Sequence, residues 1–256
     1  MSIVLQTRNL GLSFGHLAVL DGVSMRLTSG ARHAVIGPNG AGKTTLINVL
    51  AGTLTPDRGS VLLDGNDITR MGVAQRVKHG LVRTFQVNRL FAGLSPRESL
   101  TLALCEREGW GARWWRSLSR APVHDEATYW LDKLGLLPVQ HVPAAQLDYG
   151  QQRLLDIALA LVCRPRVLLL DEPAAGLPAS QRNAMMAVLK GLPGDVAIVL
   201  SEHDMNLVFG FADTISVLVQ GRVLARGTPD EIRAHRDVRA LYLGQGRHAL
   251  PLGKPE

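Results

Sequence analysis

The chain has 256 residues, of which 46% are hydrophobic and 20% are charged, with 28 Lys and Arg against 22 Asp and Glu. This length suffices for one large domain or two modest ones, and the apolar fraction excludes a disordered chain. The formal net charge of +6 favours anionic partners such as phosphates, nucleic acid or a lipid surface, without choosing among them.

Neither a disulfide scaffold nor a membrane span is expected. Cys105 and Cys163 lack the spacing of a disulfide framework or a zinc site, which favours a reducing compartment. No stretch approaches the roughly 18 to 20 uninterrupted apolar residues of a membrane span, and residues 1–8 lack the pattern of a secretory signal. We therefore expect a protein of the cytoplasm, free or attached to a membrane through another protein.

The predicted elements alternate short apolar runs with helical stretches, which is typical of an α/β fold with a mostly parallel sheet. The opening, up to about Leu27, reads as short alternating strands and predicts an antiparallel β subdomain. Between about residues 94 and 161 helical spacing dominates, which predicts a helical insertion. We expect residues 1–245 to form one domain with this insertion in its α/β core, and residues 246–256 to form a polar C-terminal tail. The other strand candidates are Ala34–Ile36, Val61–Leu63, Val167–Leu170 and Ala197–Leu200.

A glycine-rich loop follows the first of these strand candidates and matches G-x-x-x-x-G-K-[ST] at every fixed position. Its glycines would let backbone N–H groups converge on phosphates, and the dipole of the following helix would add to the attraction. Lys43 would place a positive charge beside the β- and γ-phosphates, and the Thr44 hydroxyl would bind Mg²⁺. A P-loop NTPase core is therefore predicted, with phosphate contacts from Gly37, Pro38, Asn39, Gly40, Ala41, Gly42, Lys43, Thr44 and Thr45.

Two adjacent carboxylates, Asp171 and Glu172, follow the apolar run Val167–Leu170. An apolar strand carries a carboxylate to its end only at a cost in free energy, so such a pair is rarely incidental. Asp171 fits the Mg²⁺-holding role that accompanies a phosphate loop. Glu172 suits a base that polarises an attacking water, a role worth roughly 10²–10⁴ in rate. The alternative is a helix cap ahead of Pro173.

Three further residues have both a functional and a plain structural interpretation. His203 follows the strand candidate Ala197–Leu200, so it would reach the γ-phosphate at the sheet edge or serve only a structural role. Phe14 would stack on a base or pack in the core. Gln86 has no distinguishing context and reads by itself as a surface glutamine.

Together these residues resemble the ATP-binding cassette family, whose ATPases drive membrane transporters. The resemblance runs from about Ile3 to Gly244 and is most specific at residues 147–153, Leu-Asp-Tyr-Gly-Gln-Gln-Arg, which precede the Asp171-Glu172 pair as the family's signature loop does. Within the family, the chain is similar to ATPase subunits of importers for branched-chain amino acids and related polar amides such as urea. This closer similarity lies in residues 83–86, 171–177, 202–205, 227–232 and 241–244.

The resemblance implies roles that the residues alone do not. Phe14 would stack on adenine, and Gln86 would sense Mg²⁺ and the attacking water while contacting a transmembrane partner. Asp148, Gly150 and Gln151 would act in trans, closing over ATP held by the phosphate loop of a second ATPase subunit. The metal ligands would be Thr44, Gln86 and Asp171, and the catalytic residues Glu172 and His203.

The resemblance also implies a setting. With ATP and Mg²⁺ as cofactors, such a subunit would work at the cytoplasmic face of the cell membrane, held there by two permease subunits. A substrate-binding protein would complete the complex on the periplasmic or extracellular side, and no nucleic acid is expected.

Two departures from the family pattern bear on the second ATPase subunit. Asp148 stands where the signature commonly has Ser; Asp is an equally good helix cap, but it is a poor neighbour for a γ-phosphate. Pro178 and Ala179 stand where a polar Asn or Asp commonly follows the Gly-Leu pair, and Pro lacks a backbone donor. Both changes favour one degenerate ATP site, in a heterodimer with a different ATPase chain.

Residues 107–120 hold three of the four tryptophans and four arginines. Such a segment would pack inside the helical insertion, meet a membrane or a transmembrane partner, or stack on nucleic acid.

Two other functions remain open from sequence. One is the ATPase of a lipid or polysaccharide exporter, whose sequences resemble this subgroup. The other is a soluble cassette ATPase acting on nucleic acid or ribosomes, for which the charge of +6 is a weak hint. That second class usually carries two cassettes or a long coiled coil, and this chain shows one phosphate loop and no sustained heptads.

Overall fold

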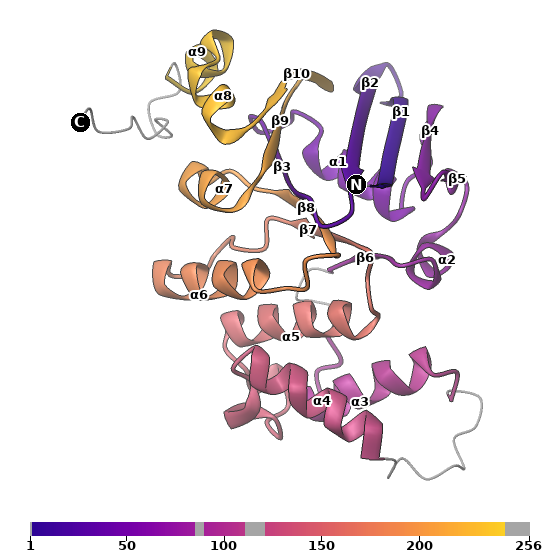
Figure 1. The fold of residues 1–256 in the computed structure, drawn as a ribbon, viewed down its shortest axis with the longest axis vertical. Helices are drawn as coiled ribbons and strands as arrows, with labels where there is room; N and C mark the ends of the chain where they lie inside the picture. The colour runs from indigo at the N-terminus through magenta and orange to yellow at the C-terminus, as the bar shows by residue number, and fades with distance from the viewer. Residues whose placement is uncertain (1, 85–89, 111–120, 244–256) are drawn as a thin grey trace. The chain divides into compact units, whose positions relative to one another are not determined.

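The computed structural model describes residues 2–84, 90–110 and 121–243, and its chain divides into two units. Unit 1 is made of residues 1–81, 166–175 and 192–256, and unit 2 of residues 82–165 and 176–191. Figure 1 shows the elements of both units along the chain.

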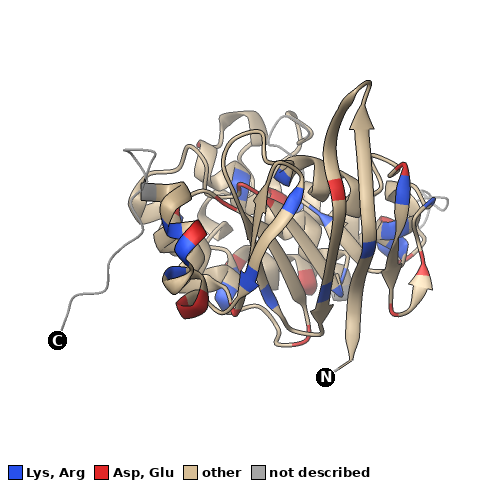
Figure 2. Cartoon of the chain, turned by 90° about the horizontal axis from the view of Figure 1, so that it is seen from above, with Lys and Arg blue, Asp and Glu red and all other residues tan. Residues whose placement is uncertain are grey.

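An antiparallel sheet in unit 1 has the order β2 (Leu17–Thr28), β1 (Ile3–Phe14), β4 (Arg58–Leu63) and β5 (Asn66–Asp67). Figure 2 shows β1 rising from the N-terminus as one long strand. The antiparallel prediction for the opening is confirmed, although the structure has two twelve-residue strands rather than several short ones. Their pairing shifts register between Thr7 and Leu10, where Asn9 has a φ of 46°.

The strand predicted at Val61–Leu63 exists as part of β4, and it pairs with β1 in this antiparallel sheet. Its Val61 and Leu63 side chains are buried in the same cluster as apolar side chains of β1 and β2.

A second sheet has six strands and contains the parallel core that the sequence predicts. Its central pairs, β3 with β8, β3 with β9 and β7 with β8, are all parallel, and β10 pairs antiparallel with β9. The inner strands are buried on both faces, which explains why their sequences are continuous apolar runs rather than alternating ones. The order is β10 (Arg222–Gly227), β9 (Thr214–Val219), β3 (Arg32–Ile36), β8 (Ala197–Ser201), β7 (Val167–Asp171) and β6 (Leu81–Arg83).

Helix α1 (Lys43–Ala51) lies against the strands of both sheets in unit 1 and buries Leu46, Ile47 and Leu50 among them. The other helices of this unit are α2 (Val73–Lys78), α7 (Met205–Phe211), α8 (Pro229–Ala234) and α9 (Arg236–Leu243).

After the end of β6, the ordered elements of unit 2 in its described residues are helical, as predicted for residues 94–161. Helix α3 begins with a capping box in which the Ser95 hydroxyl and the Glu98 carboxylate each bond the other's backbone N–H. Arg107 at its end forms an ion pair with Glu126 on α4. The elements are α3 (Pro96–Arg107), α4 (Ala121–Lys133), η2 (Leu137–Val139), η3 (Ala144–Gln146), α5 (Tyr149–Val162) and α6 (Ala179–Lys190).

Within the described ranges, none of the helices has both the length and the apolar character needed to cross a membrane.

Candidate nucleotide site

Three neighbouring strands of the six-stranded sheet end beside one another. Ser201 at the end of β8 lies opposite Val35 of β3 on one side and opposite Asp171 of β7 on the other. Because these strands are parallel, their carboxyl ends form one edge, which is where ligands bind in open α/β sheets. The phosphate loop after β3 and the carboxylate pair after β7 therefore share this edge.

The phosphate loop needs its glycines for both conformation and space. Gly42 has a φ of 100°, and a Cβ atom on it would lie 2.6 Å from the carbonyl oxygen of Val19. A Cβ atom on Gly37 would overlap the carbonyl oxygen of Leu218. Gly42 is the N-cap residue of helix α1 and has no side chain with which to cap the N–H groups of the first turn.

Lys43 is 7% exposed and folds back over this loop. Its Nζ donates to the carbonyl oxygens of Gly37, at 2.7 Å, and Pro38, at 3.0 Å. Burial lowers the pKa of Lys43, and the charges of Glu172 and Asp171 oppose that shift. The lysine and both carboxylates thus lie at the same edge of the sheet, as the strand pairing shows.

Asp171 accepts a short hydrogen bond at Oδ1 from the hydroxyl of Ser201, which is fully buried. The backbone N–H of Glu172 bonds to the carbonyl oxygen of Ser201 at 3.0 Å. Glu172 has a φ of 45°, a left-handed conformation that costs a non-glycine residue free energy. The chain therefore turns sharply at Glu172, immediately after the strand ends.

His203 follows the buried Glu202, and its own side chain is 46% exposed. The Glu202 carboxylate, 1% exposed, accepts the N–H of His203 and the N–H of Ala174, each at 3.1 Å. Burial raises the pKa of Glu202, and these two N–H bonds oppose the shift. Glu202 thus joins the turn after β7 to the turn after β8.

Phe14 lies at the tip of the β1–β2 hairpin, where it pairs with Leu17 and is 52% exposed. The core alternative is thereby wrong, and the stacking role stays a prediction. Gln86 and residues 111–120 of the Trp- and Arg-rich segment lie outside the described residues.

In unit 2, Asp148 caps α5 as the sequence predicts. Its Oδ1 accepts the N–H of Gln151 at 2.8 Å, and the Gln151 side chain accepts the N–H of Asp148 at 3.1 Å. Gly150 lies beside Gln181 of α6, whose amide oxygen would be 2.5 Å from an added Cβ atom. Pro178 occupies the N-cap position of α6.

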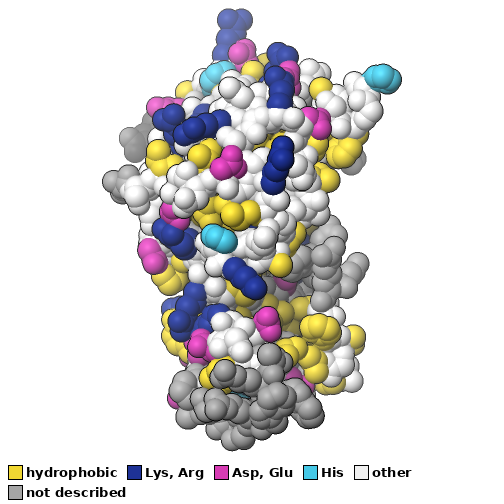
Figure 3. Space-filling view, turned by 90° about the vertical axis from the view of Figure 1, so that its right-hand side faces the viewer, with side chains coloured by type: hydrophobic (Ala, Val, Ile, Leu, Met, Phe, Trp, Pro, Cys, Tyr) yellow, Lys and Arg dark blue, Asp and Glu magenta, His cyan; other side chains and the backbone are white. Residues whose placement is uncertain are grey.

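Charged side chains are spread over the surface. On the face in Figure 3, outside its grey atoms, basic and acidic side chains are interspersed rather than separated into single-sign patches.

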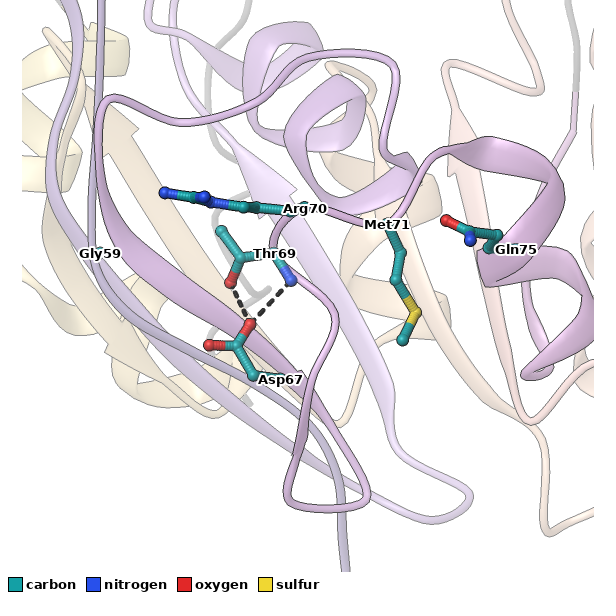
Figure 4. Close-up of a pocket in the computed structure, with 6 residues that line it drawn as sticks. All are labelled: Gly59, Asp67, Thr69, Arg70, Met71 and Gln75. Carbon is teal, nitrogen blue, oxygen red and sulfur yellow. Dashed lines mark hydrogen bonds between the residues drawn. The ribbon is translucent and has the colours of Figure 1, made fainter.

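A hollow of about 610 Å³ lies by β5 and α2, apart from the phosphate loop. Figure 4 shows Asp67 there, accepting hydrogen bonds from the N–H and hydroxyl of Thr69. Its carboxylate is therefore occupied by its own turn, and the lining contains none of the predicted site residues.

A family model for ABC transporters matches residues 20–175, more than half of the chain. The chain belongs to the ABC transporter family. A second family model, described as a branched-chain amino acid ATP-binding cassette transporter, matches residues 222–248 of this ABC ATPase.

Relatives match over nearly the whole length of the chain. The ABC ATPase is 37% identical to the high-affinity branched-chain amino acid transport ATP-binding protein BraF of Pseudomonas aeruginosa, over 94% of this chain and 98% of that protein. It is 32% identical to the probable branched-chain amino acid transport ATP-binding protein LivG of Archaeoglobus fulgidus, over 94% of this chain and 95% of that protein.

Among solved structures, the ADP conformation of MJ1267, an ATP-binding cassette of an ABC transporter, matches with a TM-score of 0.83 and 29% identity. The match covers 96% of this chain and all of that one. The predicted fold class is confirmed, and the chain is a nucleotide-binding ATPase that works with membrane permeases.

Sequence reasoning missed two residues of this ABC ATPase site, Ser201 and Glu202. The signal was present, since both are polar and directly follow the apolar run Ala197–Leu200. What the sequence did not show is that β8 lies between β3 and β7, so that its end is surrounded by the other two.

Proposed function

We propose that this chain is the ATP-hydrolysing subunit of an importer for branched-chain amino acids or related small amides. The proposal for ATP chemistry rests on one observation above all: the phosphate loop with Lys43 and the Asp171-Glu172 pair follow parallel strands that end at one edge of the sheet. The substrate class rests on the names of the relatives and on the match at residues 222–248.

Residues 37–45 would hold the phosphates of ATP. The loop's open backbone and the uncapped start of α1 would supply N–H donors, and Lys43 would exchange its two carbonyl partners for phosphate oxygens. That exchange would keep the Lys43 ammonium hydrogen-bonded throughout, so nucleotide binding would cost little free energy at this group. Phe14, exposed at its hairpin tip, would stack on the adenine.

Mg²⁺ fits the donors of this site. Thr44 and Asp171 offer a hydroxyl and a carboxylate oxygen, and Gln86 would add an amide oxygen. Mg²⁺ is usually held by one or two carboxylates together with substrate phosphates and water, and this donor set is of that kind. When bound, the ion would neutralise charge that develops on the phosphates.

Glu172 would act as the base that orients and polarises the attacking water, and His203 would contact the γ-phosphate. The support is their placement on the same sheet edge as the phosphate loop. The Ser201 hydroxyl would keep the Asp171 carboxylate turned inward by donating to it.

We further propose that residues 1–245 work as one ATPase domain at the cytoplasmic face of the membrane. Two permease subunits would hold it there, with a second and different ATPase chain and an external substrate-binding protein in the same complex. The capped signature loop at Asp148, Gly150 and Gln151 would face ATP on the other ATPase subunit.

The test uses a tagged Glu172→Gln chain, isolated from native membranes with Mg-ATP, and identifies every chain that comes with it. Glu231→Gln is the matched control, because Glu231 also accepts a backbone N–H but belongs to the cap of α8. We expect two permeases and a second ATPase in the Glu172→Gln sample, and ATP turnover at least tenfold below that of Glu231→Gln.

Leucine uptake by cells lacking the gene then tests the substrate class: the wild-type chain should restore it and Glu172→Gln should not. Co-isolation of nucleic acid or ribosomes alone would support the soluble alternative. Permeases together with lipid or polysaccharide assembly proteins, and no effect on uptake, would support an exporter.

A further inference from the structure

Glu202 is a buried carboxylate to which neither the sequence nor the proposed mechanism gives a role. It lies in the turn after β8, with 1% of its surface exposed. Burial is the largest influence on its pKa, and it is opposed by backbone N–H groups and by His203.

The partners of this carboxylate come from two separate turns. One oxygen accepts the N–H of Ala174, two residues after Glu172. The other accepts the N–H of His203, and the N–H of Asp204 is a third backbone donor. Backbone N–H groups thus replace the water that the carboxylate has lost, which is how a buried charge becomes tolerable.

These bonds join the turn that carries the proposed base to the turn that carries the proposed phosphate contact. The base residue is held in a left-handed conformation, with a φ of 45°, which persists only when surrounding structure enforces it. The carboxylate also lies 3.7 Å from Nδ1 of the His203 ring. It therefore constrains the backbone on one side and is near the imidazole on the other.

We propose that Glu202 is a positioning residue for ATP hydrolysis, which fixes the separation between Glu172 and His203 through its bonds to both turns. The inference rests on the proposed roles of those two residues. Glu202 would not touch ATP; it would act by keeping the base and the histidine at the distance that the reaction needs.

The test compares Glu202→Gln with Glu202→Asp in the full-length chain within its purified complex. Gln keeps the shape but replaces one acceptor oxygen with an NH₂ group. That NH₂ group would face a backbone N–H, and two donors cannot form a hydrogen bond with each other. We expect kcat to fall at least tenfold in Glu202→Gln, with the KM for ATP and nucleotide affinity within twofold of wild type. Glu202→Asp, which keeps the charge, should recover part of the kcat.

Glu231→Gln again serves as the control, since it removes a carboxylate that accepts a backbone N–H outside the site. Equal kcat in Glu202→Gln and Glu231→Gln would overturn the proposal. So would a joint loss of kcat, ATP affinity and thermal stability in Glu202→Gln with no recovery in Glu202→Asp, because that pattern describes a purely structural residue.

A double variant separates this inference from the function on which it rests. If Glu202 acts through the base, Glu202→Gln should slow the Glu172→Gln background by less than twofold, because effects on one catalytic unit do not add. Multiplicative losses would overturn the positioning role. Normal ATP turnover in the single variant Glu172→Gln would instead show that Glu172 is not the base.

Discussion

Asp148 would serve two roles, as the cap of helix α5 and as a neighbour of a γ-phosphate, and an aspartate suits only the first. It caps α5 through the N–H of Gln151, a task that Ser performs as well. In a dimer closed over ATP it would also lie near a γ-phosphate, and a like-charge pair at 4 Å costs about 4 kcal/mol at an effective dielectric of 20. The cap is a property of this chain, and the cost appears only in the assembly.

We expect Asp148→Ser to raise the ATPase activity of the assembled complex severalfold, because it keeps the cap and removes the charge. Thermal unfolding of the chain should be nearly unchanged. Asp148→Ala is the control: it removes both charge and cap, so it should lower the unfolding temperature. Unchanged ATPase activity in Asp148→Ser would contradict a degenerate site caused by this residue.

At the scale of elements, the end of α1 is held by a residue of another helix. Arg76 of α2 is fully buried, and its guanidinium donates to the carbonyl oxygens of Val49 and Leu50 in the last turn of α1. It also donates to the carbonyl oxygens of Thr69 and Met71. Burial lowers the pKa of Arg76 to about 10, which still leaves it charged at neutral pH.

Arg76→Met should therefore destabilise the chain by about 3 kcal/mol or more, because it leaves four carbonyl oxygens without this donor in a buried site. Lys78→Met, an exposed residue of the same helix, is the control and should change stability by less than about 0.5 kcal/mol. Urea unfolding measures both. Similar losses in the two variants would contradict the role of Arg76 in holding α1.

Strand β3, which leads into the phosphate loop, contains a histidine that stays neutral. His33 is 1% exposed, and its Nε2 lies 3.0 Å from the Ser216 hydroxyl. Burial and the charge of Arg226 lower the pKa of His33 to about 3. The unfolded chain binds a proton there below about pH 6.5 and the folded chain does not, so falling pH favours unfolding.

Between pH 7 and 5.5 the wild type should lose about 1 kcal/mol more of its unfolding free energy than His33→Gln does. The amide of Gln can still bond Ser216 but has no proton to take up. Urea unfolding at the two pH values gives the difference. Parallel losses in both proteins would mean that His33 does not set the acid sensitivity in this range.

At the scale of the whole molecule, the excess positive charge is unevenly compensated. Asp21 forms ion pairs with Arg58 and Arg222. Arg26 and Arg226, by contrast, line a hollow of about 500 Å³ that contains no carboxylate among its lining residues. Burial and the charge of Arg26 lower the pKa of Arg226.

Arg26→Gln should therefore raise the unfolding temperature by about 1–3 °C at low salt, because it removes a repulsion. The increase in unfolding temperature should vanish at about 0.5 M salt. Exposed charges are already screened at about 0.15 M salt and are screened more strongly at this higher concentration. Arg239→Gln, an exposed residue of α9, gives the same change in net charge and should leave the temperature unchanged. An equal rise in both variants would point to net charge alone.

The phosphate loop, the Asp171-Glu172 pair and the cap at Asp148 were predictable because each depends on a few consecutive residues. The parallel strands β3, β7 and β8 were predictable too, since burial on both faces leaves an unbroken apolar run, whereas the parallel strand β9 was not among the predicted strands. For the β1–β2 hairpin the sequence predicted antiparallel strands but not their length. The reason is that the register shift near Asn9 interrupts the alternation of buried and exposed side chains.

Sequence by itself determined the family, the nucleotide chemistry and most strand positions. The tertiary structure alone decided which strands are neighbours, and hence that Ser201 lies between β3 and β7 and that Glu202 bonds to Ala174. It also decided that Arg76 supports α1. The physical reason is the same in each case: these partners are separated by 26 or more residues, and only packing brings them within hydrogen-bond distance.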